Sequence, residues 1–311
     1  MTAMTAKQFI SSLRGELRLD EPMHRHTTWR VGGTADRFYL PADREDLQIF
    51  LQSLPANEPL AWVGLGSNLL VRDAGFRGTL IAPQQGLVAH ERLDGDRVRL
   101  EAGLTCAKAA RFCSRHGLCG LEFFAGIPGT VGGALFMNAG AFGGETWSQL
   151  IEVETMDRHG SVHRRRAEEF NVAYRNVQMP VQEEWFVSAI FQLQPGDAEQ
   201  STLRIKALLE ERNRRQPIGA ASCGSVFRNP PGDFAARLIE ASGLKGVCVN
   251  GATVSEKHAN FILNSANATA ADIEALVKLV QERVQQQHGL LLQPEFQILG
   301  EPRRFDEEQG S

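Results

Sequence analysis

The strongest constraint on this chain is a stretch of small residues, AGIPGTVGGA at positions 125–134, with four glycines and one proline. A single turn does not require so many glycines. Pro128 fixes one backbone angle while the glycines permit positive φ, so the segment can form a rigid, concave row of amide donors suited to a pyrophosphate. The segment lacks the Gly-Lys-Ser/Thr ending of an NTPase phosphate loop, which disfavours ATP hydrolysis.

The small residues continue in MNAGAFGGE at positions 137–145, where Asn138 and Glu145 are polar. Two ligands that meet at one surface would explain a run of this length. A second glycine turn, GLGSN at positions 64–68, follows an apolar stretch and would also let a phosphate approach the backbone. Leu69 stands where a Rossmann fingerprint needs glycine, so that fold loses support and a purely structural turn stays open.

The composition limits the class of protein. The 311 residues, 42% hydrophobic and 23% charged, predict two or three packed units. A net charge of -4 gives no general attraction to nucleic acid or an anionic membrane, so an anionic ligand needs a local site. Five cysteines without a C-x-x-C pair predict reduced thiols and no metal site. The N-terminal residues lack a signal-like apolar run and no segment resembles a membrane span, so we expect a cytoplasmic protein.

Hydrophobic periodicity predicts a mixed chain. Helices are expected at residues 43–54, 105–116, 202–215, 234–242 and 270–288. Strands are expected at residues 60–63, 79–82, 97–102, 150–157, 161–166, 185–194, 260–264 and 290–299. Asp43 is a predicted N-cap, and Gly117, Gly243 and Gly289 follow predicted helix ends. Pro217 marks a boundary before the last unit.

Seven segments, in this order along the chain, resemble the UDP-N-acetylenolpyruvoylglucosamine reductase family. They are TTWRVGGTADRF, VGLGSNLLV, GIPGTVGGALFMNAGAFGGE, AYR, CGSVFRNP, VSEKHANFILN and LLQPEFQILG. The resemblance covers nearly the whole chain, and the ordered set carries it rather than any one segment. The stretch between Arg175 and Ser225 lacks room for the inserted tyrosine loop of the family's longer form, so the chain resembles the shorter class.

The resemblance implies an α+β fold, in which an FAD-binding fold of the vanillyl-alcohol-oxidase (PCMH) type is followed by a C-terminal α+β substrate domain. The expected parts are residues 1–70 and 71–198 for the two FAD-binding subdomains, 199–301 for the substrate domain and 302–311 for a tail. Implied FAD contacts are Gly64, Leu65, Gly66, Ser67, Asn68, Gly126, Ile127, Pro128, Gly129, Thr130, Gly132 and Gly133, with Arg30, Gly32 and Gly33 in support. NADPH is the implied reductant, and we expect a monomer.

The implied reaction is the reduction of an enolpyruvyl ether on a UDP-sugar. Hydride added to the terminal carbon pushes charge onto the carboxylate, so the site needs a cation near that charge and an acid beside the adjacent carbon. By match to the family, Arg175 is the cation, Ser225 the proton donor and Glu295 the third catalytic residue. From the residues alone, a surface arginine, a loop serine and an edge-strand carboxylate stay open.

The implied substrate contacts are Asn138, Arg228, Asn229, Lys257 and His258. Their amides and positive charges suit a diphosphate and a uracil, whereas a solvated loop is the alternative. Two other functions remain in view. Another oxidoreductase of the same flavin superfamily, such as an alcohol or lactone oxidase, would commonly tether its flavin through His or Cys, and no such linkage is identifiable in the sequence. A non-enzymatic nucleotide-sugar or flavin-binding sensor should lack one of the three catalytic residues. All three are present.

Overall fold

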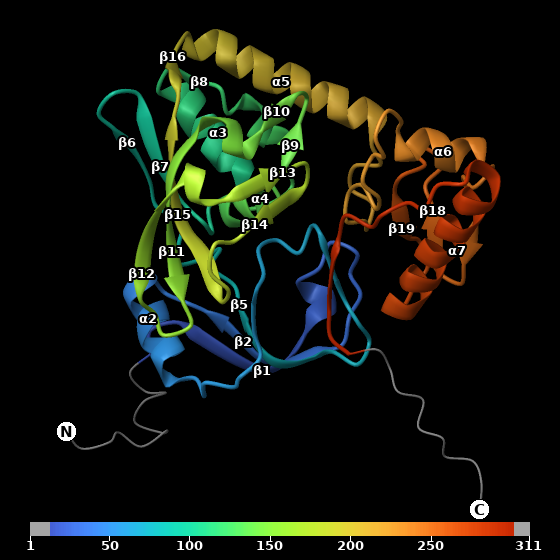
Figure 1. Cartoon of the computed structure of the whole chain (residues 1–311), viewed down its shortest axis with the longest axis horizontal. Helices are drawn as coiled ribbons and strands as arrows, with labels where there is room; N and C mark the ends of the chain where they lie inside the picture. The colour runs from blue at the N-terminus through green and yellow to red at the C-terminus, as the bar shows by residue number, and fades with distance from the viewer. Residues whose placement is uncertain (1–12, 302–311) are drawn as a thin grey trace, which may run out of the picture. The chain divides into compact units, whose positions relative to one another are not determined.

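The computed structural model describes residues 13–301, and the expectations for residues 1–12 and 302–311 lie outside the described residues. The chain forms two compact units, each assembled from separate segments (Figure 1). Residues 13–18, 37–65 and 79–214 make the first unit, and residues 19–36, 66–78 and 215–301 make the second. Among the described residues, no helix has the length and apolar composition of a membrane span.

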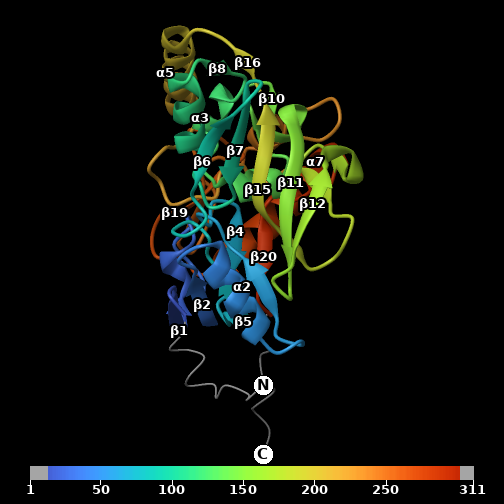
Figure 2. The same cartoon turned by 90° about the vertical axis from the view of Figure 1, so that its left-hand side faces the viewer.

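An antiparallel five-stranded sheet organises the first unit. Its order is β12-β11-β15-β7-β6, and Figure 2 shows these strands side by side. The bounds are β6 (His90–Leu93), β7 (Arg97–Glu101), β11 (Leu150–Asp157), β12 (Val162–Arg166) and β15 (Glu184–Gln192). The hairpin expected around residues 158–160 is confirmed, because Met156 of β11 pairs with Val162 of β12.

Helices pack against this sheet and bury the unit's core. They are α3 (Cys106–Arg115), η2 (Glu122–Gly126) and α4 (Val131–Phe136), and α4 contacts β7 and β15. Thr105 caps α3 by accepting the Lys108 N–H at 3.3 Å, and Gly117 follows the helix with φ +64°. The shared core includes Leu100, Ala109, Phe124, Leu135 and Phe191.

Helix α2 (Arg44–Ser53) belongs to the first unit, where its Leu47 and Phe50 share a core with Met156 of β11. Asp43 is its N-cap and accepts the Asp46 N–H at 2.9 Å, as predicted. The neighbouring sheet has the order β1-β2-β5-β3, formed by β1 (Glu16–Pro22), β2 (Thr34–Leu40), β3 (Leu60–Trp62) and β5 (Phe76–Ile81). Strand β3 pairs in parallel with β5, where Leu60 faces Thr79.

Short elements complete the first unit. They are β8 (Leu118–Cys119), β9 (Gly140–Ala141), β10 (Gly144–Glu145), η3 (Thr146–Gln149), η4 (Ala167–Glu169), β13 (Asn171–Ala173), β14 (Asn176–Gln178) and β16 (Gln194–Pro195). Helix α5 (Ala198–Arg215) begins four residues before the predicted Thr202. Asp197 explains the difference, because its carboxylate accepts the Gln200 N–H at 2.7 Å and so caps an earlier first turn.

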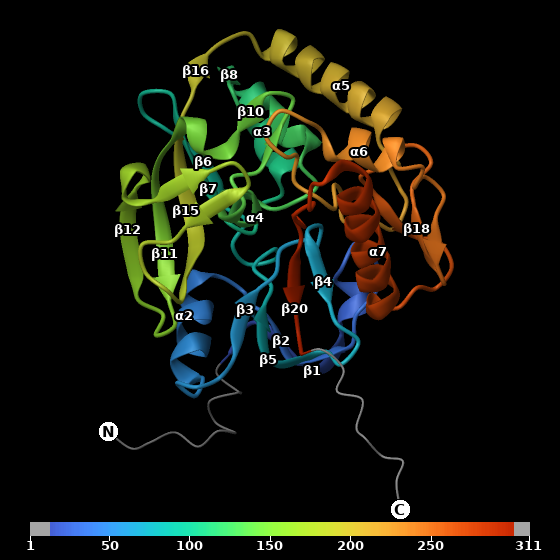
Figure 3. The same ribbon diagram turned by 45° about the vertical axis from the view of Figure 1, so that its right-hand side comes forward.

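The second unit combines helices with a small antiparallel sheet (Figure 3). The sheet is β17 (Cys248–Val249), β18 (Ala252–Val254) and β19 (Ile262–Asn264), and the helices are η1 (Met23–Arg25), α6 (Ala235–Ala241) and α7 (Ala270–His288). Helix α7 matches its predicted bounds. Thr269 and Asp272 form a capping box at its start, and Gly289 ends it in the left-handed conformation with φ +69°.

Early segments of the chain contribute to the core of the second unit. Trp29 is fully buried, donates its indole N–H to the Ile262 carbonyl at 2.8 Å and meets Phe296 edge to face. Strand β4 (Leu69–Val71) pairs in parallel with β20 (Gln297–Leu299), which Figure 3 shows side by side. The core of this unit is therefore assembled from both ends of the chain.

The predicted strand at residues 290–299 is wrong in its length, because only Gln297–Leu299 pairs as a regular strand. Pro294 lacks an amide donor and interrupts any longer ladder. An isolated antiparallel bridge joins Phe227 to Pro294 instead. The cysteines are free thiols, as predicted, although Cys248 is exposed while Cys106, Cys113 and Cys223 are buried.

Candidate active site

The two glycine-rich segments meet inside the first unit. A Cβ built on Gly64 would lie 2.7 Å from the Thr130 hydroxyl oxygen, and one built on Gly132 would lie 2.9 Å from the Ala102 Cβ. Glycine is therefore required at both positions for close approach. Pro128 and Gly133, on the same segment, are exposed, so this edge offers a backbone surface with little side-chain cover.

Most of the expected amide donors in residues 129–133 already donate to groups of the chain itself. The N–H groups of Val131 and Gly132 donate to Leu104 and Ala102 carbonyls at 2.8 Å. Those of Gly129 and Gly133 donate to the Ile127 carbonyl and to the Thr130 hydroxyl. These amides close the loop onto the end of β7 and start α4, so the glycines serve close packing. Gly133 is nevertheless exposed, and a Cβ there would meet only the Thr130 hydroxyl oxygen, at 3.6 Å, so the backbone at this position is open to a ligand.

Residues 66–68 of the glycine turn at positions 64–68 belong to the second unit. Gly66 has φ +61°, and a Cβ there would lie 1.9 Å from the His26 carbonyl oxygen, so only glycine fits. Asn68 donates its side-chain amide to the Glu295 carbonyl at 3.2 Å. Leu65, just before Gly66, is exposed, and Ser67, between Gly66 and Asn68, is half-buried. This turn thus links a predicted cofactor segment to a predicted catalytic one.

The predicted supporting residues lie at a neighbouring loop of the second unit. Arg30 is exposed and adopts a positive φ of 58°, and Gly32 has φ +118°. A Cβ on Gly33 would lie 2.3 Å from the Asp73 carbonyl oxygen. These glycines therefore let two backbone segments touch.

Arg175 lies at the tip of the hairpin formed by β13 and β14, in the first unit. Ala173 pairs with Asn176, which leaves Tyr174 and Arg175 as a two-residue turn. Arg175 has φ +54°, a conformation that a residue with a side chain adopts only at a cost in energy. Its Nη2 donates to the Gly140 carbonyl at 2.9 Å and its Nη1 to the Asn138 carbonyl at 3.4 Å. The guanidinium also lies 5.1 Å from the centre of the Tyr174 ring.

Two backbone features let the Arg175 guanidinium reach the Gly140 carbonyl. Strands β9 and β10 form a tight hairpin whose tip residues, Phe142 and Gly143, both have positive φ. A Cβ on Gly140 would lie 3.1 Å from the Arg175 Nη1 and 2.6 Å from the Gly144 carbonyl oxygen. Sequence reasoning did not single out Gly140, although its place within the small-residue run was visible.

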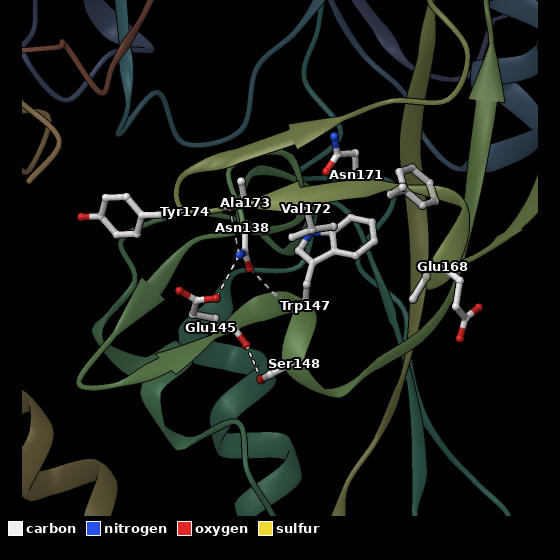
Figure 4. A pocket seen from close by; sticks show the side chains of 11 residues that line it. Asn138, Glu145, Trp147, Ser148, Glu168, Asn171, Val172, Ala173 and Tyr174 are labelled. Atoms are coloured by element: carbon white, nitrogen blue, oxygen red, sulfur yellow. Dashed lines mark hydrogen bonds between the residues drawn. The ribbon is translucent and has the colours of Figure 1, made fainter. Parts of the chain in front are cut away.

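Asn138, predicted to contact substrate, is 2% exposed. Its side-chain amide donates to the Glu145 carboxylate at 3.1 Å and to the Ala173 carbonyl at 3.4 Å, and its oxygen accepts the Trp147 N–H at 3.2 Å (Figure 4). Burial and these three partners hold the side chain in place, and its predicted contact with the substrate stays a prediction. An open cavity of about 770 Å³ borders it, lined in part by Trp147, Phe170 and Tyr174.

The segments that carry Ser225 and Glu295 are hydrogen-bonded to each other in the second unit. The Glu295 N–H donates to the Val226 carbonyl at 2.8 Å, and the Arg228 N–H donates to the Gln293 carbonyl at 2.9 Å. The segments around Ser225 and Glu295 therefore run antiparallel to each other. Both residues are half-buried.

Asn260 fixes the Ser225 segment. It is 3% exposed, accepts the Phe227 N–H at 2.9 Å and donates to the Phe227 carbonyl at 2.8 Å through the same side chain. Its backbone carbonyl accepts the Val226 N–H at 2.9 Å. Sequence reasoning missed Asn260, since an asparagine before an apolar run gives no local sign of a partner 33 residues away.

The Cys223 thiol lies beside this pair. Burial raises the pKa of Cys223 well above its usual range, and the nearby Glu295 carboxylate adds to the shift. The thiol is therefore protonated near neutral pH, which favours a packing role over a nucleophilic one.

The predicted substrate residues of the second unit differ in their surroundings. The buried Nε of Arg228 has no hydrogen-bond partner within residues 13–301. Asn229 accepts the Ala235 N–H at 3.1 Å, which commits its side-chain oxygen to the start of α6. Lys257 is exposed, and burial lowers the pKa of the half-buried His258. Arg228 is thus the strongest candidate of this set for binding an anion.

Comparisons with known proteins agree with the two-part organisation. A family model described as FAD binding domain matches residues 35–166, and one described as UDP-N-acetylenolpyruvoylglucosamine reductase, C-terminal domain, matches residues 216–299. The α+β fold class, an FAD-binding domain followed by that C-terminal domain, is thereby confirmed.

Whole-length relatives carry the same name. A UDP-N-acetylenolpyruvoylglucosamine reductase of Alkalilimnicola ehrlichii is 60% identical over 92% of this chain and 96% of its own length. The Legionella pneumophila reductase is 55% identical over 94% of this chain and 95% of its own. The crystal structure of the Thermus caldophilus reductase has a TM-score of 0.78 and 33% identity, and it covers 93% of this chain and 100% of that one. The chain belongs to the UDP-N-acetylenolpyruvoylglucosamine reductase family and is an FAD-dependent oxidoreductase.

Proposed function

We propose that the chain reduces the enolpyruvyl ether of UDP-N-acetyl-3-O-(1-carboxyvinyl)glucosamine to UDP-N-acetylmuramate, a step of peptidoglycan precursor synthesis, through Arg175, Ser225 and Glu295. Membership of the reductase family supports the reaction. FAD, when bound, supplies the hydride that originates from NADPH. The exposed backbone at Gly133, beside the close approach of Gly64 to Thr130, supports binding of this cofactor there.

Arg175 supplies the positive charge in this proposal. Hydride addition at the terminal carbon turns the conjugated carboxylate into an enolate-like group, and a guanidinium can hold its two oxygens at once. The observation that carries the assignment is the backbone: Arg175 keeps a costly positive φ while two carbonyls orient its guanidinium.

Ser225 donates a proton to the carbon next to the carboxylate. A serine hydroxyl is a weak acid, so a neighbouring group has to supply or share the proton. Glu295 is the candidate, because its N–H donates to the carbonyl of Val226, the residue after Ser225, so the two backbone segments are neighbours in the second unit. The proposal requires that Arg175 and this pair act on one substrate.

Arg228 binds the diphosphate in the proposal, supported by its buried Nε without a partner among residues 13–301. Lys257 and His258 remain predicted contacts, and Asn229 can act through its amide group. The division at residues 70, 198 and 301, a monomeric state, NADPH as the preferred reductant and a cytoplasmic location also stay predictions.

The visible spectrum of the purified protein tests the proposed function. We expect a yellow protein that NADPH bleaches anaerobically and that regains its colour only when the enolpyruvyl sugar is added. Colour that returns with oxygen but not with the sugar would favour an oxidase. Sugar binding without any return of colour would favour a sensor, and a protein that does not take up FAD would contradict the proposal altogether.

A further inference from the structure

Asn138 contacts both the turn that carries Arg175 and the Arg175 guanidinium. Its side-chain amide reaches the carbonyl of Ala173, which is the last residue before the Tyr174–Arg175 turn. Its backbone carbonyl accepts the Arg175 Nη1. One residue therefore contacts the hairpin at Ala173, which Figure 4 draws beside it, and also contacts the guanidinium of Arg175.

Asn138 is itself held in one orientation. Its oxygen accepts the Trp147 N–H, and its amide donates to the Glu145 carboxylate. Trp147 is anchored in turn, because its indole N–H donates to the Leu135 carbonyl at 2.8 Å. Asn138 also has φ +41°, a region that asparagine tolerates better than most residues with side chains. A buried amide with all its partners satisfied is a rigid connection.

We propose that Asn138 is a positioning residue that holds Arg175 in the orientation needed to grip the substrate carboxylate. This inference rests on the proposed function of Arg175. The side chain of Asn138 fixes the base of the turn, and its carbonyl, together with that of Gly140, fixes the guanidinium. Asn138 does not touch the substrate, since it is buried.

The chemistry requires both a donor and an acceptor at this position. Asn138→Asp has the same shape and keeps an oxygen for the Trp147 N–H. It replaces the donor with an oxygen that faces the Glu145 carboxylate and the Ala173 carbonyl, so both contacts become repulsive. Asn138→Gly removes the side chain and still accepts the positive φ, which separates loss of the amide from backbone strain.

The test measures each half of the reaction separately in both variants. We expect the rate at which the enolpyruvyl sugar reoxidises the reduced enzyme to fall about 10- to 100-fold. FAD content and the rate of reduction by NADPH should stay at wild-type values. Asn171→Asp is the matched control, because it makes the same chemical change in an exposed residue of the same hairpin and should change nothing.

A second readout does not depend on turnover. UDP-N-acetylmuramate carries the carboxylate that Arg175 grips, whereas UDP-N-acetylglucosamine lacks it. We expect calorimetric titration to show that Asn138→Asp weakens binding of the first compound and leaves binding of the second unchanged. Equal loss for both compounds would overturn the proposal.

A double-mutant cycle separates positioning from general structure. If Asn138 acts through Arg175, Asn138→Asp causes no further loss in an Arg175→Lys background. Full additivity would overturn the inference while the proposed function stands. Loss of FAD or of folding in both Asn138 variants would also overturn it, since the residue would then hold the unit itself. A wild-type rate in Arg175→Lys alone would instead reject the proposed role of Arg175.

Discussion

A buried asparagine fixes a catalytic candidate in each unit, but the two do so in different ways. Asn260 binds both the N–H and the carbonyl of Phe227, two residues after Ser225. Asn138 binds a carbonyl one residue before the turn that carries Arg175, at the longer distance of 3.4 Å. The Ser225 segment is irregular and is held by an isolated bridge at Phe227, whereas Arg175 is held in a strained turn. A proton donor with a short side chain is placed by its backbone, and a long guanidinium has to be oriented at its far end as well.

The largest expected effect is that of Ser225→Ala. Removing a positioned proton donor should slow reoxidation by the sugar about 10²- to 10⁴-fold. Reduction by NADPH should keep its rate, because the hydroxyl takes no part in that step. Rapid-mixing measurements of both halves check this. Normal turnover of the sugar would show that the proton comes from elsewhere.

Gly140→Ala tests whether the far end of Arg175 needs its orientation. The new Cβ would approach the Arg175 Nη1 to 3.1 Å and the Gly144 carbonyl to 2.6 Å, so the guanidinium must shift. We expect about a tenfold loss in kcat for the sugar, smaller than for Ser225→Ala. Ala141→Ser, on the same strand, is the control. Unchanged kcat in Gly140→Ala would mean that the orientation seen here is not used.

Asn260→Asp tests whether the backbone contacts of Asn260 place Ser225. The carboxylate still accepts the Phe227 N–H but opposes the Phe227 carbonyl, which should lower the free energy of unfolding by about 1–3 kcal/mol. Turnover of the folded enzyme should fall as well. Asn264→Asp is the matched control, because the Asn264 amide donates to the Trp29 carbonyl in the same unit. It should also lower the free energy of unfolding, but the folded enzyme should keep its turnover. Equal turnover in the two variants would contradict this placement of Ser225.

The smallest expected effect is a pH dependence on the Ser225 side. Burial lowers the pKa of His258 below its usual 6.5, and its Nδ1 accepts the Asn260 N–H at 3.3 Å. The folded state therefore binds fewer protons at His258 than the unfolded state does. The free energy of unfolding keeps its full value above pH 6.5 and decreases as the pH falls below it. When the pH is lowered, the protection of the Phe227 amide against hydrogen exchange should decrease more than that of residues 171–178. His258→Asn should remove that difference, and its persistence would assign it to another group.

Elements with local signals were predictable from the sequence. Helix α7 has Thr269 and Asp272 at its start and Gly289 after its end, and β11 has the sequence LIEVETMD followed by a turn that contains Gly160. The family segments also identified Arg175, Ser225 and Glu295 as candidates. These signals depend on neighbours within a few residues, so the sequence displays them directly.

The remaining features depend on distant partners. Nothing near Trp29 shows that its indole meets the Ile262 carbonyl, and nothing near Leu69 shows that it pairs with Gln297. Asn138 was noticed as a polar residue among small ones, but its burial depends on Ala173 and Trp147. Arginine also carries no preference for positive φ, so the sequence did not indicate the strained turn at Arg175.

The most direct test of the central claim is the ratio of the two half-reaction rates in Arg175→Lys. Lysine keeps the charge but lacks the planar pair of donors, so it should hold the carboxylate less well. We predict wild-type FAD content, an unchanged rate of reduction by NADPH and about a 10²-fold slower reoxidation by the enolpyruvyl sugar. If both rates fall together, or if neither falls, Arg175 does not stabilise the charge that develops on the substrate.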